Sequence, residues 1–298
     1  MKLNELLNIK YPIIQGGMAN IATGEFAAAV SNAGGLGLIA TGGMTPSMFR
    51  ENIRKCQLLT KNPFGVNLML MHPDIDELVK ITLEENVKIV TTGAGNPGKY
   101  MDAFKSAFVK VFPVVSGVAL AKKMEQLGAT GIIAEGAESG GHVGEMTTMT
   151  LVPQVVDAVN IPVIAAGGIA DNRQYQAALA LGAVGVQVGT CLLVATECPI
   201  HEEYKNALIK AKDNQTTVTG RIAGTPVRVI KNQMSREYIK REKEGATIME
   251  LEQYTLGSLR RAVFDGDTKT GSLMAGQACG QLKKIQPVKQ ILEAIISK

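Results

Sequence analysis

The sequence of 298 residues predicts an α/β fold, a closed (β/α)8 TIM barrel with an inserted segment after strand 8, and three observations lead to it. Eight short runs rich in β-branched or apolar residues, each bounded by glycine or proline, recur along the first two-thirds of the chain. Segments with helical spacing separate them, at a repeat of roughly 20 to 30 residues that is typical of parallel βα units. The runs are nearly continuous in apolar residues, as strands buried on both faces require.

The eight predicted strands are YPIIQ from Tyr11, LGLIA from Leu36, FGVNLML from Phe64, VKIVTT from Val87, VKVFPVV from Val109, ATGIIAE from Ala129, IPVIAAGG from Ile161 and AVGVQVG from Ala183. Helical patterns between them include FRENIRKCQLL, DIDELVKITLEEN, ALAKKMEQLG and RQYQAALALG. Eight units favour a closed barrel over a doubly wound open sheet. The one GxGxxG match, Gly93–Gly98, is followed by a strand that ends without an acidic residue to bind a ribose, so it is interpreted as a barrel loop.

Composition narrows the class of protein. Hydrophobic residues make up 46% of the chain and charged residues 19%, which suits a large core, and the net charge of +4 is too small to suggest nucleic-acid binding. The four cysteines have neither redox nor metal spacing, so no metal site is expected. Glycines interrupt the uncharged run 174–196, which argues against a membrane span. The segment MKLNELLNIK has no apolar signal-peptide core, so a cytoplasmic protein is expected.

The alternation of strand and helix patterns stops after the eighth predicted strand. Residues 195–267 are therefore expected to form an insertion or small subdomain near the barrel mouth, with residues 1–194 and 268–298 forming the barrel and VKQILEAIIS its last helix. Between residues 201 and 244, ten Lys and Arg stand against six Asp and Glu, a net charge of +4. This excess indicates either a solvated helical surface or a docking site for an acidic partner.

Two glycine-containing loops predict a phosphate site, because catalytic groups in such a barrel follow the carboxyl ends of the strands. Gly167 and Gly168 follow strand seven and precede Asp171, whose pairing with Gln174 resembles a helix capping box. After strand eight come Gly189 and Thr190. Free backbone N–H groups in these two loops can hold a phosphate dianion, which leaves a sugar phosphate, a nucleotide or a flavin mononucleotide as candidate ligands.

Other strand ends carry groups suited to a planar ring and to proton transfer. Gly17 and Met18 follow strand one, and Asn67 offers an amide that can pair with a ring's polar edge. His142, next to Gly141 in a glycine-rich loop after strand six, can give or take a proton near neutral pH. Glu135 ends that strand and is interpreted either as a ring or ribose ligand, a group that tunes the histidine, or a solvated carboxylate. His72 and His201 are expected at a turn and a helix start.

The motifs YPIIQGGMA, FGVNLML, TTGAGNP, AEGAESGGHVG, TTMTLV, IPVIAAGGIAD, QVGT, IKNQ and SLMAGQ together resemble the FMN-dependent enoyl-acyl-carrier-protein reductase II family, within the nitronate monooxygenase superfamily. The resemblance implies bound FMN, NADH or NADPH as co-substrate, an enoyl thioester on acyl carrier protein as substrate, and a homodimer. It also implies that His142 donates a proton or stabilises the enolate, and that Ser272, Met274 and Gln277 close over the flavin.

Three alternatives remain at this point. A nitronate monooxygenase would use the same histidine to take a proton from a nitroalkane. An IMP-dehydrogenase-like enzyme has similar phosphate loops but needs a cysteine in the loop after strand six, where this chain has none. A non-catalytic flavin-binding protein would show no nicotinamide-driven turnover. If the basic segment docks acyl carrier protein, charge reversal at Lys205, Lys210 and Arg241 should raise the Michaelis constant for carrier-borne substrate but not for enoyl-CoA.

Overall fold

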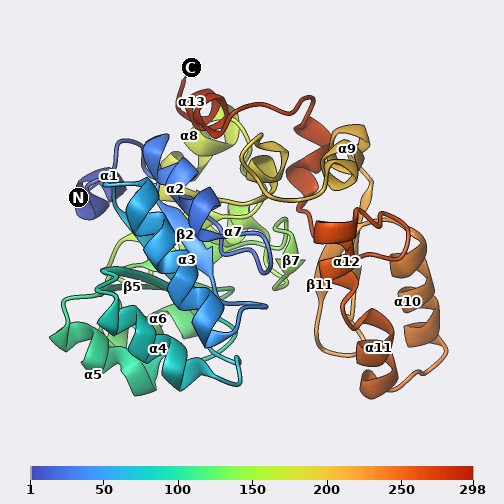
Figure 1. The fold of residues 1–298 in the computed structure, drawn as a ribbon, viewed down its shortest axis with the longest axis horizontal. Helices are drawn as coiled ribbons and strands as arrows, with labels where there is room; N and C mark the ends of the chain where they lie inside the picture. Colours follow the sequence, from blue (N-terminus) through green and yellow to red (C-terminus); the bar gives the residue numbers. More distant parts are fainter. Residues whose placement is uncertain (1, 298) are drawn as a thin grey trace.

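The computed structural model describes residues 2–297, and its main body is a parallel eight-stranded barrel (Figure 1). All eight predicted strands are present, in the order β1-β9-β8-β6-β5-β4-β3-β2. A parallel bridge between Ile14 and Leu36 joins the two outer strands and closes the circle. The strands are β1 (Ile13–Gln15), β2 (Gly37–Ala40), β3 (Phe64–Met69), β4 (Ile89–Gly93), β5 (Lys110–Val115), β6 (Ile132–Glu135), β8 (Val163–Ala166) and β9 (Gly185–Val188).

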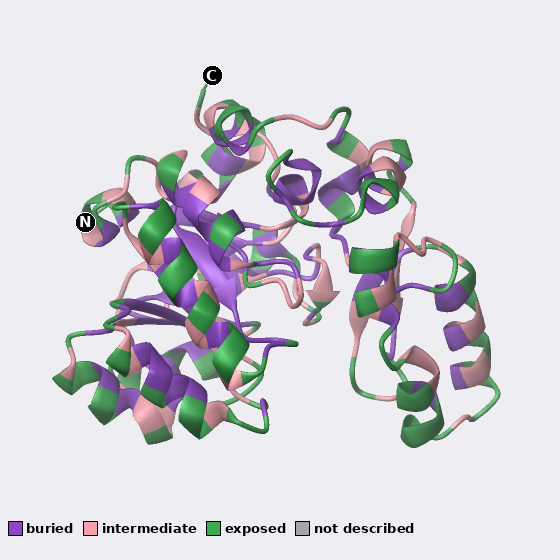
Figure 2. Cartoon of the chain, viewed as in Figure 1, coloured by how far each residue is buried: buried purple, intermediate pink, exposed green. Residues whose placement is uncertain are grey.

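Helices cover the outside of the barrel and pack on it through their apolar faces. They are α2 (Gly24–Asn32), α3 (Pro46–Leu59), α4 (Ile75–Glu84), α5 (Gly98–Ser106), α6 (Val118–Gln126), α7 (Thr148–Val156), α8 (Asn172–Ala180) and α13 (Val288–Ile296). The last of these is the predicted C-terminal helix, and it packs between α8 and α2. The glycine-rich match at residues 93–98 runs from the last residue of β4 to the first residue of α5, so residues 94–97 form the predicted barrel loop. In Figure 2 the strands are buried and the outer helix faces are exposed.

The barrel interior is filled by apolar side chains from alternating strand positions. Ile14, Phe112, Ile133 and Ile164 are fully buried members of one interior cluster. The short helix α1 (Leu3–Leu7), which the sequence pattern did not indicate, contributes Leu3 and Leu7 to the same cluster and therefore closes the end opposite the carboxyl ends of the strands. Only that carboxyl end is left for a ligand.

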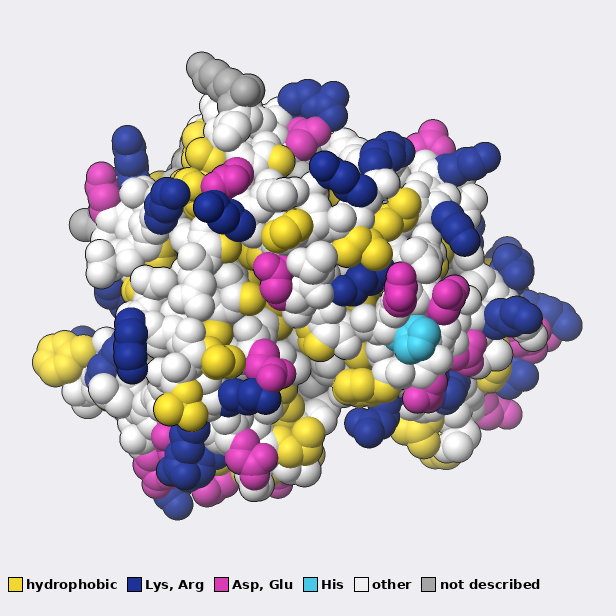
Figure 3. Space-filling view, turned by 45° about the horizontal axis from the view of Figure 1, so that its top comes forward, with side chains coloured by type: hydrophobic (Ala, Val, Ile, Leu, Met, Phe, Trp, Pro, Cys, Tyr) yellow, Lys and Arg dark blue, Asp and Glu magenta, His cyan; other side chains and the backbone are white. Residues whose placement is uncertain are grey.

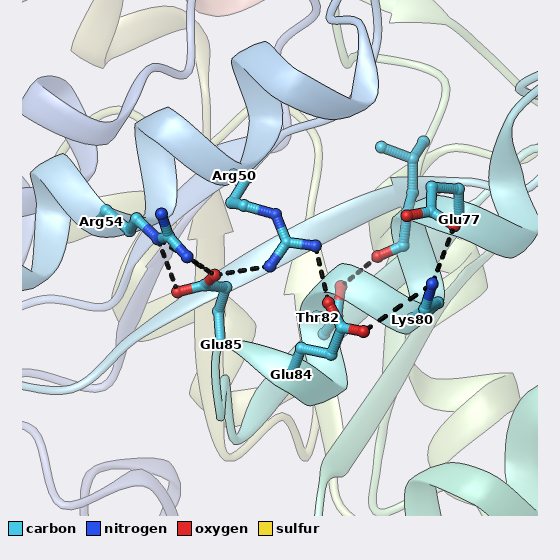
Figure 4. Close-up of polar contacts among 8 residues, drawn as sticks. Arg50, Arg54, Glu77, Lys80, Thr82, Glu84 and Glu85 are labelled. Atoms are coloured by element: carbon cyan, nitrogen blue, oxygen red, sulfur yellow. Dashed lines mark hydrogen bonds and ion pairs between the residues drawn. The ribbon is translucent and has the colours of Figure 1, made fainter.

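An ion-pair network fixes α3 to α4 on the barrel surface (Figure 4). Arg50 contacts Glu84 at 2.6 Å and Glu85 at 2.7 Å, while Arg54 reaches Glu85 at 2.8 Å. These charge-assisted hydrogen bonds hold the pKa of Glu85 below its ordinary value. Because the network lies away from the strand ends, it belongs to the scaffold.

The segment between β9 and α13 lies beside the barrel, and its part from β11 to α12 forms a lobe to the right in Figure 1. The elements of the segment are η1 (Thr190–Val194), α9 (Glu202–Lys210), β10 (Thr216–Thr219), β11 (Val227–Ile230), α10 (Gln233–Lys243), α11 (Ile248–Thr255), α12 (Ser258–Asp265) and η2 (Gln277–Gln281). The hairpin β10–β11 was not evident from the Thr- and Gly-rich sequence. It continues into the two-residue strand β7 (Gly141–His142), which gives a three-stranded antiparallel sheet across the barrel mouth.

The segment between β9 and α13 is packed in two ways. Tyr204 and Leu208 of α9, together with Ala262 and Val263 of α12, belong to the core cluster that surrounds the barrel. Met234, Tyr238 and Leu251 form a separate small core between α10 and α11. Within residues 2–297, no helix is both long and apolar enough to cross a membrane.

Candidate active site

The two loops predicted to bind phosphate lie together at the carboxyl end of the barrel. Gly167 and Gly168 have φ values of +98° and +74°, which favour glycine. Asp171 accepts from the Arg173 N–H at 2.9 Å, and the side chain of Gln174 accepts from the Asp171 N–H at 3.0 Å, so the predicted capping box at the start of α8 is confirmed. The backbone there is fixed before any ligand binds.

The C-terminal segment is tied to these loops by backbone hydrogen bonds. The Gly276 N–H donates to Thr190 Oγ1 at 2.9 Å, and the Gln277 N–H donates to the Glu138 carbonyl at 2.9 Å. A pocket of about 280 Å³ results, and Gly167, Gly168 and Gln277 are among its lining residues. Residues separated by more than a hundred positions therefore meet at one corner of the barrel mouth.

Glu138 and Thr148 are parts of this corner that sequence reasoning missed. The Glu138 carboxylate accepts from the Thr148 N–H at 2.9 Å and from its hydroxyl at 2.9 Å. The same hydroxyl lies 2.9 Å from the Gly167 carbonyl oxygen. No motif marked these residues, because their roles depend on contacts between the loop after β6 and the loop after β8.

The predicted ring-binding residues also converge, and glycines make room for them. A Cβ on Gly17 would lie 2.3 Å from the Asn67 Cγ, so only glycine allows this approach. A Cβ on Gly189 would lie 3.7 Å from the Met18 sulfur. A Cβ on Gly141 would lie 3.6 Å from the Met274 sulfur, which brings the C-terminal segment against the histidine loop.

The uppermost layer of inward-facing strand positions is polar. Asn67 Oδ1 accepts from the Thr91 hydroxyl at 2.8 Å. Glu135 and Gln187 lie at the same level, since each is aligned with Ala166 of the strand between them. Gln187 Oε1 is buried and finds no hydrogen-bond partner among residues 2–297. Gln187 was not among the predicted site residues, although one amide within an otherwise apolar strand was a usable signal.

Glu135 is half-buried at the end of β6, level with Ala166 of β8. Burial raises the pKa of its carboxyl to about 7, and the nearby Ser139 hydroxyl opposes this rise only in part. A carboxyl that titrates near neutral pH inside a cleft is typical of functional sites.

His142 is exposed at the barrel mouth, in the loop that follows β6. Its strand β7 is held in place because His142 pairs with Val227 and Gly141 with Arg228 of β11. Arg228 Nε also donates to the Ala137 carbonyl at 3.0 Å. The hairpin β10–β11 therefore positions the loop that carries the histidine.

The remaining histidines and the cysteines have structural surroundings. His72 Nδ1 accepts from the Asp74 N–H at 3.1 Å and His201 Nδ1 accepts from the Glu203 N–H at 3.1 Å, so the predicted turn and helix-start roles are confirmed. All four cysteines are buried and free, and burial raises the pKa of Cys56, Cys191 and Cys198 to about 12. Over residues 2–297, His, Cys, Asp and Glu side chains nowhere gather in a group of three that could hold a metal ion.

Comparison with known proteins places this chain in a family. The nitronate monooxygenase family model matches residues 1–81 and 73–298. A solved structure of FabK from Thermotoga maritima is 49% identical, covers 98% of this chain and 94% of that chain, and superposes with a TM-score of 0.96.

Two curated relatives extend over the same length. A probable nitronate monooxygenase of Staphylococcus saprophyticus is 32% identical over 93% of this chain and 91% of its own. The (3aS,4S,5R,7aS)-5-hydroxy-7a-methyl-1-oxo-octahydro-1H-indene-4-carboxyl-CoA dehydrogenase of Mycobacterium tuberculosis is 30% identical over 99% of this chain and 94% of its own. The chain belongs to the nitronate monooxygenase family of flavin-dependent oxidoreductases.

Proposed function

We propose that this protein is an FMN-dependent enoyl-acyl-carrier-protein reductase, which reduces the trans-2 double bond of an enoyl thioester with NADH or NADPH in fatty-acid elongation. The observation that carries the proposal is the 49% identity to FabK, an enoyl-acyl-carrier-protein reductase II, over 98% of the chain. That length includes the segment between β9 and α13, which carries reductase-like motifs such as IKNQ and SLMAGQ. The nitronate monooxygenase relatives are less similar, at about 32% identity.

The residues at the barrel mouth fit a flavin mononucleotide. The N–H groups near Gly167, Gly168, Gly189 and Thr190 suit its phosphate. The close approach of Gly17 to Asn67 suits a flat ring. The buried Gln187 Oε1, which has no hydrogen-bond partner among residues 2–297, suits a polar edge of that ring. When bound, FMN would accept hydride from the nicotinamide and supply it to the β-carbon of the substrate.

Glu135, Met18, Gly141, Met274 and Gln277 complete the proposed flavin site. Glu135 faces the barrel interior beside Ala166, Met18 lies against Gly189, and Gly141 lies against Met274. The Gln277 N–H bond to the Glu138 carbonyl holds the C-terminal segment over the same mouth. These residues would orient the group and exclude water from the reacting face.

His142 is the proposed proton donor. Hydride addition to the β-carbon leaves an enolate on the thioester, and the α-carbon then needs a proton. His142 is exposed at the mouth and is held by β11, so its ring can hydrogen-bond the enolate oxygen or supply the proton through water. The imidazole then regains a proton from solvent, to which it is open.

The carrier-docking hypothesis needs one correction. Lys205 is buried, and its Nζ donates to the Ala195 carbonyl at 2.7 Å, so it cannot meet a partner and its charge reversal would disrupt the fold. Lys210 is exposed, and Arg241 lies on a cleft of the lobe. We propose acyl carrier protein as the substrate carrier, with Lys210→Glu expected to raise the KM for carrier-borne substrate and to leave enoyl-CoA turnover unchanged.

The proposal is tested by the visible spectrum of the purified protein, followed by anaerobic addition of NADH or NADPH and then of crotonyl thioester. Bleaching by the nicotinamide and reoxidation by the thioester are the expected results. Oxygen uptake with a nitroalkane, without thioester turnover, would instead support a nitronate monooxygenase. A flavin spectrum without turnover of either substrate would support a binding protein. The proposed homodimer is tested by the molecular mass in solution.

A further inference from the structure

The lobe contains a cleft of about 540 Å³ that is separate from the barrel mouth. Side chains of α10, α11 and α12 line it, and four of them are basic: Arg236, Lys240, Arg241 and Arg261. Glu237 is the one carboxylate in the lining, which leaves an excess of three positive charges. A concave site of this size suits a small polyanion. At the right-hand edge of the molecule in Figure 3, Lys and Arg side chains lie interspersed with Asp and Glu side chains.

Helix α10 has an apolar face that packs against α11 and a basic face that lines the cleft. Met234 and Tyr238 bury the apolar face of this helix against Leu251. Arg236 and Lys240, spaced by one helical turn, lie on the face that lines the cleft. Neither forms an ion pair with any residue in 2–297, so both charges are available to a ligand.

The other two basic groups are already held in position. The Arg241 guanidinium lies 4.2 Å from the centre of the Tyr254 ring, and its Nε donates to Glu237 at 2.8 Å. Arg261 donates to the Leu256 carbonyl at 3.1 Å and forms an ion pair with Asp267 at 3.9 Å, which offsets part of its charge. Arginine stacked on an aromatic ring offers a flat cationic surface that suits a nucleobase or a phosphate.

The cleft also lies within reach of the active site along the chain. Val227 of β11 is paired with His142, and α10 begins at Gln233, six residues later. Six extended residues span at most about 20 Å, and the seven helical residues from Gln233 to Lys240 add about 10 Å, so at most about 30 Å separates Val227 from Lys240. A long ligand could therefore have one end in the cleft and the other at the histidine.

We propose that this cleft binds the phosphorylated adenosine end of a nucleotide ligand whose other end reaches the site at His142. The inference rests on the proposed function, because NADPH and a coenzyme A thioester both carry such an end far from the reacting carbon. The first carries a 2′-phosphate and the second a 3′-phosphate. The similarity to a dehydrogenase of a coenzyme A thioester makes the second source relevant.

The test is calorimetric titration of the full-length, flavin-loaded protein with three probes: adenosine 2′,5′-bisphosphate, adenosine 3′,5′-bisphosphate and AMP. One bisphosphate should bind more tightly than AMP. In the double variant Arg236→Gln/Lys240→Gln its affinity should fall at least about tenfold, a difference of about 1.4 kcal/mol. Lys243→Gln, on α10 but outside the cleft lining, is the matched control and should bind as the wild type does.

Preference for the 2′-phosphate identifies NADPH as the source, and preference for the 3′-phosphate identifies coenzyme A. The inference is overturned if neither bisphosphate binds, if AMP binds equally well, or if Lys243→Gln weakens binding as much as the double variant. Because the titration needs no turnover, it is independent of the proposed function. A protein that binds a bisphosphate in the cleft but reduces no enoyl thioester would overturn the activity alone.

Discussion

Replacement of Glu135 by glutamine should change how the stability of the flavin-free protein depends on pH. Burial raises the pKa of this carboxyl from 4.5 to about 7. The folded state therefore favours the protonated form, and the corresponding stability is fully present below pH 4.5 and is lost as the pH rises through 7. One pKa unit corresponds to about 1.4 kcal/mol of unfolding free energy. Because only part of the titration falls between pH 5 and pH 8, the unfolding free energy lost over that range is about 2.5 kcal/mol.

The assay is urea unfolding of wild type and Glu135→Gln at pH 5 and pH 8. Glutamine keeps the size of the side chain but has no charge to bury, so the variant should gain about 2.5 kcal/mol relative to wild type on going to pH 8. Glu25→Gln, at an exposed position on α2, is the control and should follow wild type. If the wild type and Glu135→Gln lose stability in parallel, the carboxyl is ionised in the folded protein and the reasoning is wrong.

Three further predictions concern the two loops predicted to bind phosphate, at Gly167–Gly168 and Gly189–Thr190. Gly167→Ala forces a side chain to φ +98° and places its Cβ 2.8 Å from the Gly136 carbonyl oxygen, so flavin absorbance after purification should be lost. Full retention of flavin absorbance would contradict the predicted role of Gly167. Asp171→Ala removes the cap of α8 and should cost about 1 kcal/mol in urea unfolding, whereas no change would argue against the cap. Thr190→Val leaves the Gly276 N–H unpaired, so amide hydrogen exchange over residues 272–281 should accelerate. Unchanged exchange would show that the bond from Gly276 to Thr190 does not hold residues 272–281 in place.

The barrel was predictable because its signal is local and repeated. Each strand run, such as IPVIAAGG from Ile161, carries its own apolar pattern and its own glycine boundary. Glycines and polar residues directly after a strand, such as Gly167 and Asn67, could be placed at the barrel mouth from topology alone. The convergence of several predicted site residues there follows from the closure of the barrel.

What the sequence did not predict depends on contacts between distant segments. The strand β7 exists only because β11 pairs with it, and two residues carry no strand pattern of their own. Glu138 is a site residue only through its bonds to Thr148. The burial of Lys205 depends on a carbonyl ten residues earlier, so its charge alone suggested an exposed surface.

His142 is proposed to supply a proton during reduction of an enoyl thioester. The most direct measurement is the anaerobic rate of crotonyl thioester reduction by nicotinamide-reduced, flavin-loaded wild type and His142→Ala. We expect normal flavin content and a rate of flavin reduction equal to wild type in the variant, with thioester turnover lowered by about 10²-fold or more, the typical contribution of a general acid. Wild-type turnover in a flavin-loaded His142→Ala protein would contradict the claim.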